Sequence, residues 1–334
     1  MNSKIRFGIV GTNFISDYIV AAGKEDDRFE AVAVCSRSQE KGSTFAAAHN
    51  IPHIFTSPQE MARSPLLDAV YVASPNSLHH FYSMLFMRHG KHVLCEKPFA
   101  SNAREAEQMI EASVKYNVTL MEAMKQTVTP NFRALEENLY RVGGIRAFSF
   151  SCCKYSIYYD HFKEGSLPNL FNPALSNGAL MDLGCYPIFP AVALFGKPKD
   201  ISASATILSS GTDAEASAHL QYDNMSGTIS CSAIFSSDLP SRIEGENGTI
   251  FIDKISRFEK ITFSDGLTQE LVDISSETPH NIYYYELAEF MNLIQDRRRE
   301  SQINSHQNSL HCMEVMDHIR RQTGVVFPAD DKIL

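Results

Sequence analysis

The sequence predicts an α/β protein in two parts: a doubly wound parallel sheet, then an α+β domain with a large, mostly antiparallel, open sheet. In the first third of the chain, apolar strand segments alternate with helical segments. Strands that are apolar throughout are typical of parallel sheets covered by helices on both faces. Beyond Gly143 and Gly144, strand-like runs follow one another between Gly, Asn and Asp clusters, as in antiparallel sheets. The length of 334 residues suits two domains.

The elements of the first part alternate regularly. Strands are expected at residues 5–10, 31–35, 54–55, 69–73, 93–95 and 118–123. Helices are expected from residue 14 and at 39–49, 79–89 and 101–116. A further helix should begin at Pro58, because Ser57 and Glu60 form a capping box around a proline at the first helical position.

The second part begins after one more helix, at residues 130–141. Its strands are expected at 145–152, 201–208, 216–222, 227–234, 249–252 and 260–263. The stretch 155–176 carries few signals and is a candidate substrate loop. The expected domains are residues 1–122 and 123–280, with helices at 282–298 and 306–323, within 281–334, packing back on the first domain.

Composition narrows the class of protein. Hydrophobic residues make up 44% and charged residues 21%, as in soluble globular proteins. The net charge of −9 without a basic block argues against nucleic acid as a partner. No apolar run approaches the roughly 20 residues of a membrane span, and no signal peptide is visible, so a cytoplasmic location is expected. Seven scattered cysteines fit free thiols, and no Cys-x-x-Cys or His-Glu-x-x-His pattern predicts a metal site.

The first strand ends at Gly11, where a helix begins. Backbone amides at a helix N-terminus lack partners and carry positive potential, so this turn can bind a pyrophosphate. The predicted contacts are Gly11, Thr12, Asn13, Phe14 and Ile15. The usual Gly-x-Gly-x-x-Gly pattern is broken, with Asn13 at the second glycine and Ser16 at the third. Asn tolerates left-handed dihedrals and Ser is small, so the geometry can survive. Taken alone, the motif fits an ordinary corner equally well; the alternating context favours a cofactor site.

The second strand ends at Cys35-Ser36-Arg37. An NAD site would place Asp or Glu near this point, to bind the ribose 2′-hydroxyl. The hydroxyl of Ser36 and the guanidinium of Arg37 suit a 2′-phosphate instead, with Lys41 adding charge. This favours NADP over NAD; the alternative is an ordinary exposed arginine.

Two later turns follow central strands of the parallel sheet. Ligands of such sheets lie at the carboxyl ends of the strands. The first turn supplies Ser74, Pro75, Asn76 and His79, and the second supplies Glu96 and Lys97. Lys97 could hydrogen-bond a substrate hydroxyl and stabilise the alkoxide that develops as hydride leaves carbon. A simple chain reversal and a surface lysine are the alternatives.

In the second part, Asp182 and Tyr186 have i, i+4 spacing and would share a helix face. An acid and a phenol that converge could move a proton. Without further context, both could equally be helix surface residues.

Together these motifs resemble the glucose–fructose oxidoreductase/inositol dehydrogenase family, written Gfo/Idh/MocA. The matching segments are Gly8-x-x-Gly11, Ser74-Pro75-Asn76-x-x-His79, Glu96-Lys97-Pro98 and Gly178-Ala179-Leu180-x-Asp182-x-Gly184-x-Tyr186-Pro187. The resemblance implies a Rossmann-like first domain and a second domain with an open sheet used for homodimers or higher homo-oligomers. It also implies hydride transfer between NADP or NAD and a hydroxyl-bearing carbon of a sugar, polyol or cyclic diol.

The resemblance also implies roles for single residues. Lys97 would be the catalytic lysine, and Asp182 would bind and orient the substrate. Many members have histidine where this chain has Tyr186; the tyrosine resembles the glucose–fructose oxidoreductase and trans-dihydrodiol dehydrogenase branch, where it exchanges the proton. The segment 126–129 lacks the Arg that often precedes the following helix in the family. Two alternatives stay open: a non-catalytic NADP-binding redox sensor, and an enzyme that reduces a carbonyl compound with NADPH.

Overall fold

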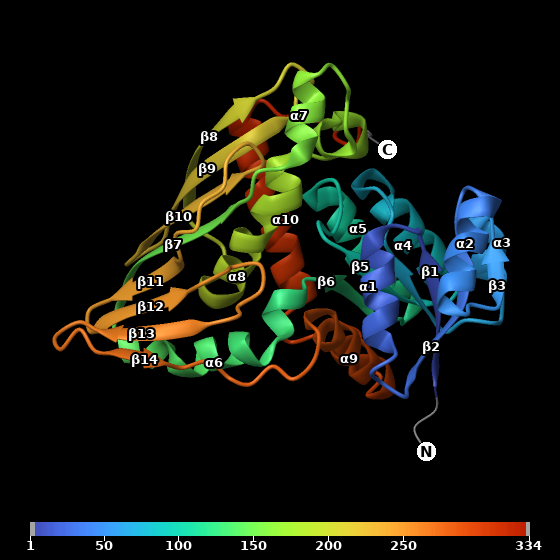
Figure 1. Cartoon of the computed structure of the whole chain (residues 1–334), viewed down its shortest axis with the longest axis horizontal. Helices are drawn as coiled ribbons and strands as arrows, with labels where there is room; N and C mark the ends of the chain where they lie inside the picture. Colours follow the sequence, from blue (N-terminus) through green and yellow to red (C-terminus); the bar gives the residue numbers. More distant parts are fainter. Residues whose placement is uncertain (1–3, 332–334) are drawn as a thin grey trace. The chain divides into compact units, whose positions relative to one another are not determined.

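A computed structural model describes residues 4–331 and divides the chain into two compact units (Figure 1). The chain up to Lys125, together with His280–Ser309, forms the first unit. Gln126–Pro279, together with the chain from Leu310 onward, forms the second.

The first unit is built on a six-stranded parallel sheet in the order β3-β2-β1-β4-β5-β6. Its strands are β1 (Ile5–Val10), β2 (Phe29–Cys35), β3 (His53–Phe55), β4 (Ala69–Val72), β5 (His92–Glu96) and β6 (Leu120–Ala123). The chain runs outward from β1 to β3 and then crosses to β4. This reversal puts the topological switch point between β1 and β4, where doubly wound sheets bind their ligands. The predicted fold class is confirmed.

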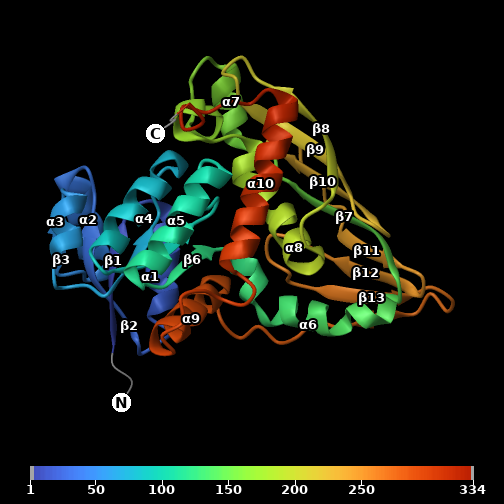
Figure 2. The ribbon, with the colours of Figure 1, turned by 180° about the vertical axis from the view of Figure 1, so that it is seen from behind.

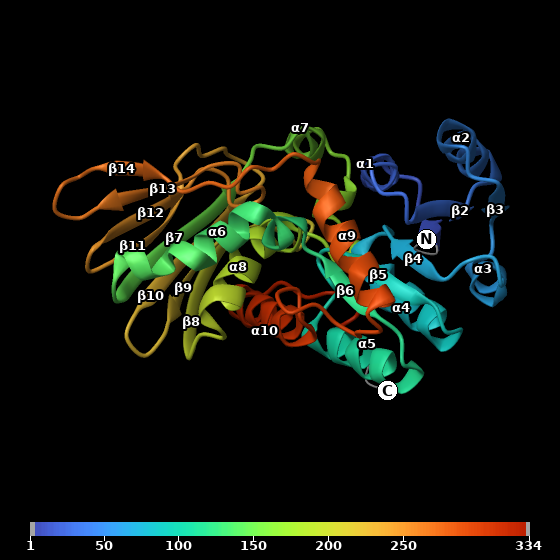
Figure 3. The same ribbon diagram turned by 90° about the horizontal axis from the view of Figure 1, so that it is seen from below.

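Helices cover both faces of this sheet. They are α1 (Phe14–Gly23), α2 (Gln39–His49), α3 (Pro58–Arg63), α4 (His79–Arg88), α5 (Ala103–Tyr116) and α9 (Ile282–Gln295). On one face, Phe7, Tyr71 and Leu94 of the strands form one buried cluster with α1, α2 and α9. In Figures 1 and 3, α4 and α5 lie side by side. Because successive strand residues point to opposite faces, strands between two helical layers must be apolar throughout.

The second unit is built on an eight-stranded sheet in the order β14-β13-β12-β11-β7-β10-β9-β8. Only β7 and β10 pair in parallel. The strands are β7 (Ile145–Cys153), β8 (Asp200–Ile207), β9 (Asp213–Gln221), β10 (Ser226–Ser232), β11 (Ser241–Gly245), β12 (Gly248–Ile252), β13 (Ile261–Asp265) and β14 (Leu271–Asp273). Two of these strands, β11 and β14, are not predicted by the sequence pattern. Both are short, and β11 carries Arg242 and Glu244 on one face, so neither gives an apolar run.

One face of this sheet is covered and the other is open. The helices of the second unit are α6 (Pro130–Asn138), α7 (Ile157–Lys163), α8 (Cys185–Phe195) and the part of α10 (His306–Thr323) from Leu310 onward. Phe195 of α8 stacks on Phe148 of β7 with ring centroids 5.0 Å apart. Figure 2 shows α8 and α10 on the same side of the sheet. On the other side, where Figures 1 and 2 show no helix of the described chain, strands present small polar residues such as Ser149, Ser217 and Thr228.

Three expectations need correction. The stretch 155–176 is not featureless, since it contains α7 and two short 3-10 turns. From Leu310, α10 belongs to the second unit rather than to the first; the side chain of Gln322 donates to the backbone oxygen of Ile201 and accepts from the amide of Ala203, both on β8. Pro173–Phe195 is long and apolar enough to cross a membrane, although 67% of its apolar 18-residue window is buried inside the protein. That burial is typical of a core helix.

Candidate active site

The Gly11 turn fits closely against the end of β4. Gly11 has φ +109°, and a Cβ there would lie 2.4 Å from the carbonyl oxygen of Ala73. Only glycine fits this position, both for its backbone conformation and for the close approach. Asn13 stabilises the contact between this turn and the end of β4, because its Nδ2 donates to the Ala73 oxygen at 2.9 Å. The turn after β1 and the turn after β4 are therefore one assembly.

Asn13 is the N-cap of α1, and its backbone is extended, with φ −90°. The left-handed tolerance expected of Asn13 is therefore not used. Its Oδ1 accepts from the amides of Ile15 and Ser16 at 3.0 and 3.1 Å, and the buried Ser16 hydroxyl donates to the oxygen of Gly11. Within residues 4–331, the amides of Thr12, Asn13 and Phe14 have no hydrogen-bond partner. These three amides are the ones that an anion can use, while the amide of Ile15 is already occupied.

The end of β2 carries positive charge. Ser36 is buried, whereas Arg37 and Lys41 are exposed. Within the described chain, neither cationic side chain has a hydrogen-bond or ion-pair partner, so both are available to a phosphate. The two hydroxyls nearby belong to Ser36 and to Ser38, the N-cap of α2.

His79 links the two later turns. It is buried, with Nδ1 2.8 Å from the oxygen of Pro98 and Nε2 3.0 Å from the oxygen of Ser74. Burial lowers the pKa of His79, and the two carbonyl contacts oppose that shift because a doubly protonated ring could donate to both. The imidazole thus holds the Ser74-Pro75-Asn76 turn to the Lys97-Pro98 turn. In this position its role is to orient the two turns.

Glu96 holds the backbone of Lys97 in place. Its buried carboxylate accepts a hydrogen bond from the Tyr71 phenol and another, at 3.2 Å, from the backbone amide of Lys97. The Lys97–Pro98 peptide bond is cis. Burial raises the pKa of Glu122 to about 8, and the nearby Lys97 ammonium is among the groups that oppose this rise. Lys97 therefore lies at the carboxyl end of β5, close enough to two buried groups, His79 and Glu122, to act on their titration.

Two buried acids near this edge were not predicted. Glu122 lies on β6, and Glu286 lies on α9, where burial raises its pKa well above the ordinary value and the charge of Glu96 raises it further. Neither oxygen of Glu286 has a partner among the described residues. The sequence gives a signal only for Glu122, which interrupts an apolar run.

In the second unit, Asp182 and Tyr186 lie on consecutive helical segments rather than on one helix. Leu180–Gly184 is a π-helical turn, and α8 follows at Cys185. Both side chains are half-buried. Single π turns inside helices occur frequently at functional sites.

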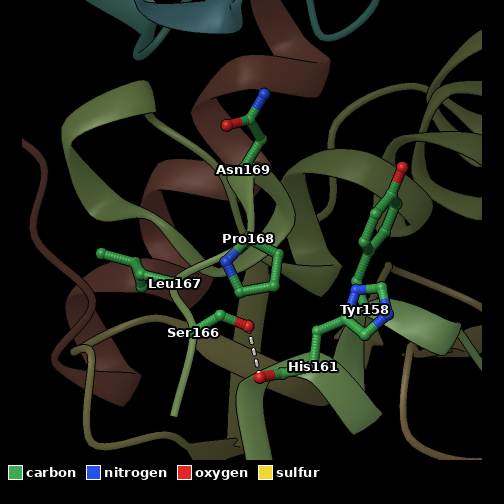
Figure 4. A pocket seen from close by; sticks show the side chains of 6 residues that line it. All are labelled: Tyr158, His161, Ser166, Leu167, Pro168 and Asn169. Atoms are coloured by element: carbon green, nitrogen blue, oxygen red, sulfur yellow. Dashed lines mark hydrogen bonds between the residues drawn. The ribbon is translucent and has the colours of Figure 1, made fainter. Parts of the chain in front are cut away.

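The stretch 155–176 contains a surface pocket. Figure 4 shows Tyr158 beside His161, and the hydroxyl of Ser166 donating to the backbone oxygen of His161 at 2.5 Å. The other lining residues are Leu167, Pro168 and Asn169.

The structure thus gathers the predicted first-unit residues at one edge of the parallel sheet, at the carboxyl ends of β1, β2, β4 and β5, with Lys41 in the first turn of α2. Asp182 and Tyr186 belong to the second unit. Across residues 4–331, no cluster of His, Cys, Asp and Glu is arranged to hold a metal.

This fold and turn chemistry define a dinucleotide-binding oxidoreductase. The family described as "Oxidoreductase family, NAD-binding Rossmann fold" matches residues 5–124, and the "GFO/IDH/MocA C-terminal domain" matches residues 141–251. The chain belongs to the Gfo/Idh/MocA family, as its motifs predicted.

Curated relatives align over nearly the whole chain. The scyllo-inositol 2-dehydrogenase (NADP(+)) IolU of Bacillus subtilis is 48% identical over 98% of this chain and 99% of its own. The uncharacterized oxidoreductase YgjR of Escherichia coli is 40% identical, with 98% of each chain covered. The trans-1,2-dihydrobenzene-1,2-diol dehydrogenase of Danio rerio is 30% identical over 98% of this chain and 99% of its own.

Solved structures share the fold at low identity. Levoglucosan dehydrogenase in complex with NADH and levoglucosan has a TM-score of 0.85 at 17% identity, covering 96% of this chain and 98% of its own. The 3-ketoreductase KijD10 of Actinomadura kijaniata with NADP and TDP-benzene has a TM-score of 0.83 at 20% identity, with the same coverage.

Proposed function

We propose that this protein is a cytoplasmic, NADP-preferring dehydrogenase that transfers a hydride between the nicotinamide and a hydroxyl-bearing carbon of a polyol, sugar or cyclic diol. One observation carries the proposal: Lys97 directly follows β5, at the same sheet edge that carries the Gly11 turn and the exposed Arg37. The 48% identity to an NADP(+)-dependent scyllo-inositol 2-dehydrogenase supports a polyol as the substrate.

The residues at this edge fit the cofactor. Gly11 has no side chain, so the turn packs directly against Ala73 at the end of β4, and the amides of Thr12, Asn13 and Phe14 have no partner within the described chain. Arg37 and Lys41 suit a 2′-phosphate, because a guanidinium and an ammonium both bind phosphate oxygens. When bound, the nicotinamide supplies the hydride acceptor or donor.

Lys97 stabilises charge on the substrate oxygen. Its ammonium donates to the hydroxyl of the reacting carbon, and this hydrogen bond strengthens as the oxygen becomes an alkoxide. The carboxylate of Glu96 accepts a hydrogen bond from the backbone amide of Lys97 and so holds the backbone there. The ring of His79 contacts the backbone oxygen of the neighbouring Pro98. The backbone that carries the lysine is therefore held in place before the substrate arrives, which lowers the cost of reorganisation.

Tyr186 takes the hydroxyl proton during oxidation and returns it during reduction, while Asp182 accepts hydrogen bonds from substrate hydroxyls. A phenol titrates near pH 10 in water, so a neighbouring positive charge is needed for it to act as a base at neutral pH. Reduction of a carbonyl compound with NADPH uses the same groups in reverse.

The direct test measures NADP+ reduction with scyllo-inositol, other inositols, aldoses and dihydrodiols, each repeated with NAD+. We expect turnover with at least one polyol and a higher kcat/KM with NADP+. Tight NADP+ binding without turnover on the whole panel would instead favour a redox sensor.

Two variants test the residue roles. Tyr186→Phe should reduce kcat by about 10²- to 10⁴-fold with little change in KM, because proton transfer acts in the transition state. Lys97→Ala should cost more. Full activity in Lys97→Ala, or equal losses of kcat and of binding in Tyr186→Phe, would contradict these roles.

A further inference from the structure

Asp213 is a buried acid outside every motif considered so far. It begins β9 and is 1% exposed. Its Oδ2 accepts from the amide of Leu180 at 2.5 Å, across 33 residues of sequence. Its Oδ1 is buried and has no hydrogen-bond partner among the described residues. Leu180 is the first residue of the π-helical turn that carries Asp182. Amides at such a position have no partner within their own helix, so Asp213 caps the turn from a neighbouring strand.

The glycines of the turn leave room for this contact. A Cβ on Gly178 would lie 2.2 Å from Oδ1 of Asp213. A Cβ on Gly184 would lie 3.1 Å from Sγ of Cys231 on β10. The amide of Asp182 donates to the oxygen of Gly178 at 2.9 Å. The turn therefore packs closely against β9 and β10, and its first amide, that of Leu180, donates to Asp213.

We propose that Asp213 is a positioning residue of the dehydrogenase: its carboxylate holds the Leu180 amide and so fixes where the following turn presents Asp182 and Tyr186. The proposal rests on the function proposed above. Asp213 touches no reacting atom; it acts through the backbone of the turn.

The charge on Asp213 makes its hydrogen bond with the Leu180 amide depend on pH. Burial raises the pKa of Asp213 to about 6, while the Leu180 amide and the charge of Arg320 on α10 oppose the rise. Glu215 on the same strand raises it further, and the Cys231 thiol faces it from β10. At pH 7 and above the carboxylate is ionised and makes a charge-assisted hydrogen bond. Below about pH 6 it is protonated, and the contact to Leu180 weakens.

The same shift acts on stability with a definite sign. The pKa is higher in the folded than in the unfolded protein, so the group's contribution to stability is complete below about pH 4 and is lost as pH rises through about 6. Above that pH the ionised Asp213 costs stability, although it serves the site. Replacing Asp213 by the neutral isostere Asn should remove this loss of stability. The same substitution should weaken the hydrogen bond to the Leu180 amide.

The experiment compares Asp213→Asn, Asp213→Ala and the matched control Asp223→Asn, whose exposed carboxylate follows β9 and pairs with Lys199. Profiles of kcat/KM from pH 5 to 9 and melting temperatures are recorded for each. For the wild type we expect an acid limb near pH 6. In Asp213→Asn that limb should disappear, kcat at pH 8 should fall roughly fivefold to tenfold, and the melting temperature at pH 8 should be equal or higher. Asp223→Asn should behave like the wild type. An unchanged pH profile in Asp213→Asn would overturn the proposal.

Hydrogen exchange at the Leu180 amide gives a readout that does not depend on turnover. We expect protection in the wild type at pH 8, retained in part by Asp213→Asn and lost in Asp213→Ala. Unchanged protection in Asp213→Ala would overturn the proposal even if the alanine variant folded poorly elsewhere. If the wild type turns over no substrate, the proposed function fails, while this measurement still decides whether Asp213 holds the turn.

Discussion

At the scale of single residues, the first unit separates charge that faces solvent from charge that is buried. Arg37 and Lys41 lie exposed at the end of β2, whereas Glu96, Glu122 and Glu286 are enclosed near the end of β5. The exposed cations suit a ligand that arrives from solution. The enclosed acids instead shape the surroundings of Lys97, and the raised pKa values of Glu122 and Glu286 make stability depend on pH.

Arg37→Ala tests the exposed cations. The loss of a charge-assisted bond of about 1.5–3 kcal/mol should lower kcat/KM for NADP+ roughly 10- to 100-fold and leave NAD+ within about twofold. Steady-state kinetics with both cofactors measures this. Arg63→Ala, which removes an exposed arginine at the end of α3, is the control. Equal losses with the two cofactors would exclude a 2′-phosphate contact.

Glu122→Gln tests the buried acids. Because burial raises the pKa of Glu122 to about 8 in the folded protein, its contribution to stability is complete below about pH 4.5 and is lost as pH rises through 8. Urea unfolding of the wild type should therefore show stability falling by a few kcal/mol between pH 5 and 8.5, with a smaller fall in Glu122→Gln. The exposed Glu107→Gln on α5 should keep the wild-type slope. A slope that Glu122→Gln does not change would contradict the assignment.

At the scale of elements, the first turn shows how a broken consensus still folds. Asn13 replaces a glycine, yet it caps α1 and binds the end of β4 with one side chain. Gly-x-Asn therefore forms the same strand-to-helix turn as the usual Gly-x-Gly. Because the Asn13 side chain occupies the amide of Ile15, fewer amides are left for the pyrophosphate.

Asn13→Ala should lower the free energy of unfolding by about 1 kcal/mol, and Asn13→Gly by only a few tenths, since glycine is a tolerable N-cap. Urea denaturation monitored by circular dichroism measures both. Equal destabilisation by the two substitutions would show that the cap is not what Asn13 contributes.

Elements defined by local pattern could be predicted, and those defined by distant contacts could not. The strands of the parallel sheet and α5 follow from apolar runs and an amphipathic period, and the Gly11 turn follows from its place after β1. By contrast, α7 is short and without a buried residue, and the π turn depends on Asp213 far along the chain. The capping role of Asn13 and the link made by His79 are likewise tertiary contacts, invisible in sequence spacing.

At the scale of the whole molecule, the open face of the eight-stranded sheet is a candidate surface for self-association, in line with the resemblance to Gfo/Idh/MocA proteins. Its half-exposed or exposed residues include Ser149 and its neighbour Thr228, together with Arg242 and His219, which pair with these two residues on the adjacent strands. A sheet face that no helix covers can pack against a second copy of itself.

Light scattering coupled to size-exclusion chromatography should show a dimer or larger assembly. Thr228→Glu should shift the mass toward the monomer, because it would bury an unpaired charge in the interface. Thr268→Glu, in the exposed turn between β13 and β14, should leave the mass unchanged. A monomeric wild type would contradict this surface assignment.

The first unit is discontinuous in sequence, since α9 completes the buried cluster on one face of its sheet. During synthesis on the ribosome, the part of that face that α9 covers stays uncovered until residues 282–295 have left the exit tunnel, after the whole eight-stranded sheet has emerged. Phe7, whose ring centroid lies 6.1 Å from that of Phe290 on α9, thus lacks this cover in every shorter nascent chain, and a truncated product that stops before α9 presents an aggregation-prone surface to chaperones and proteases.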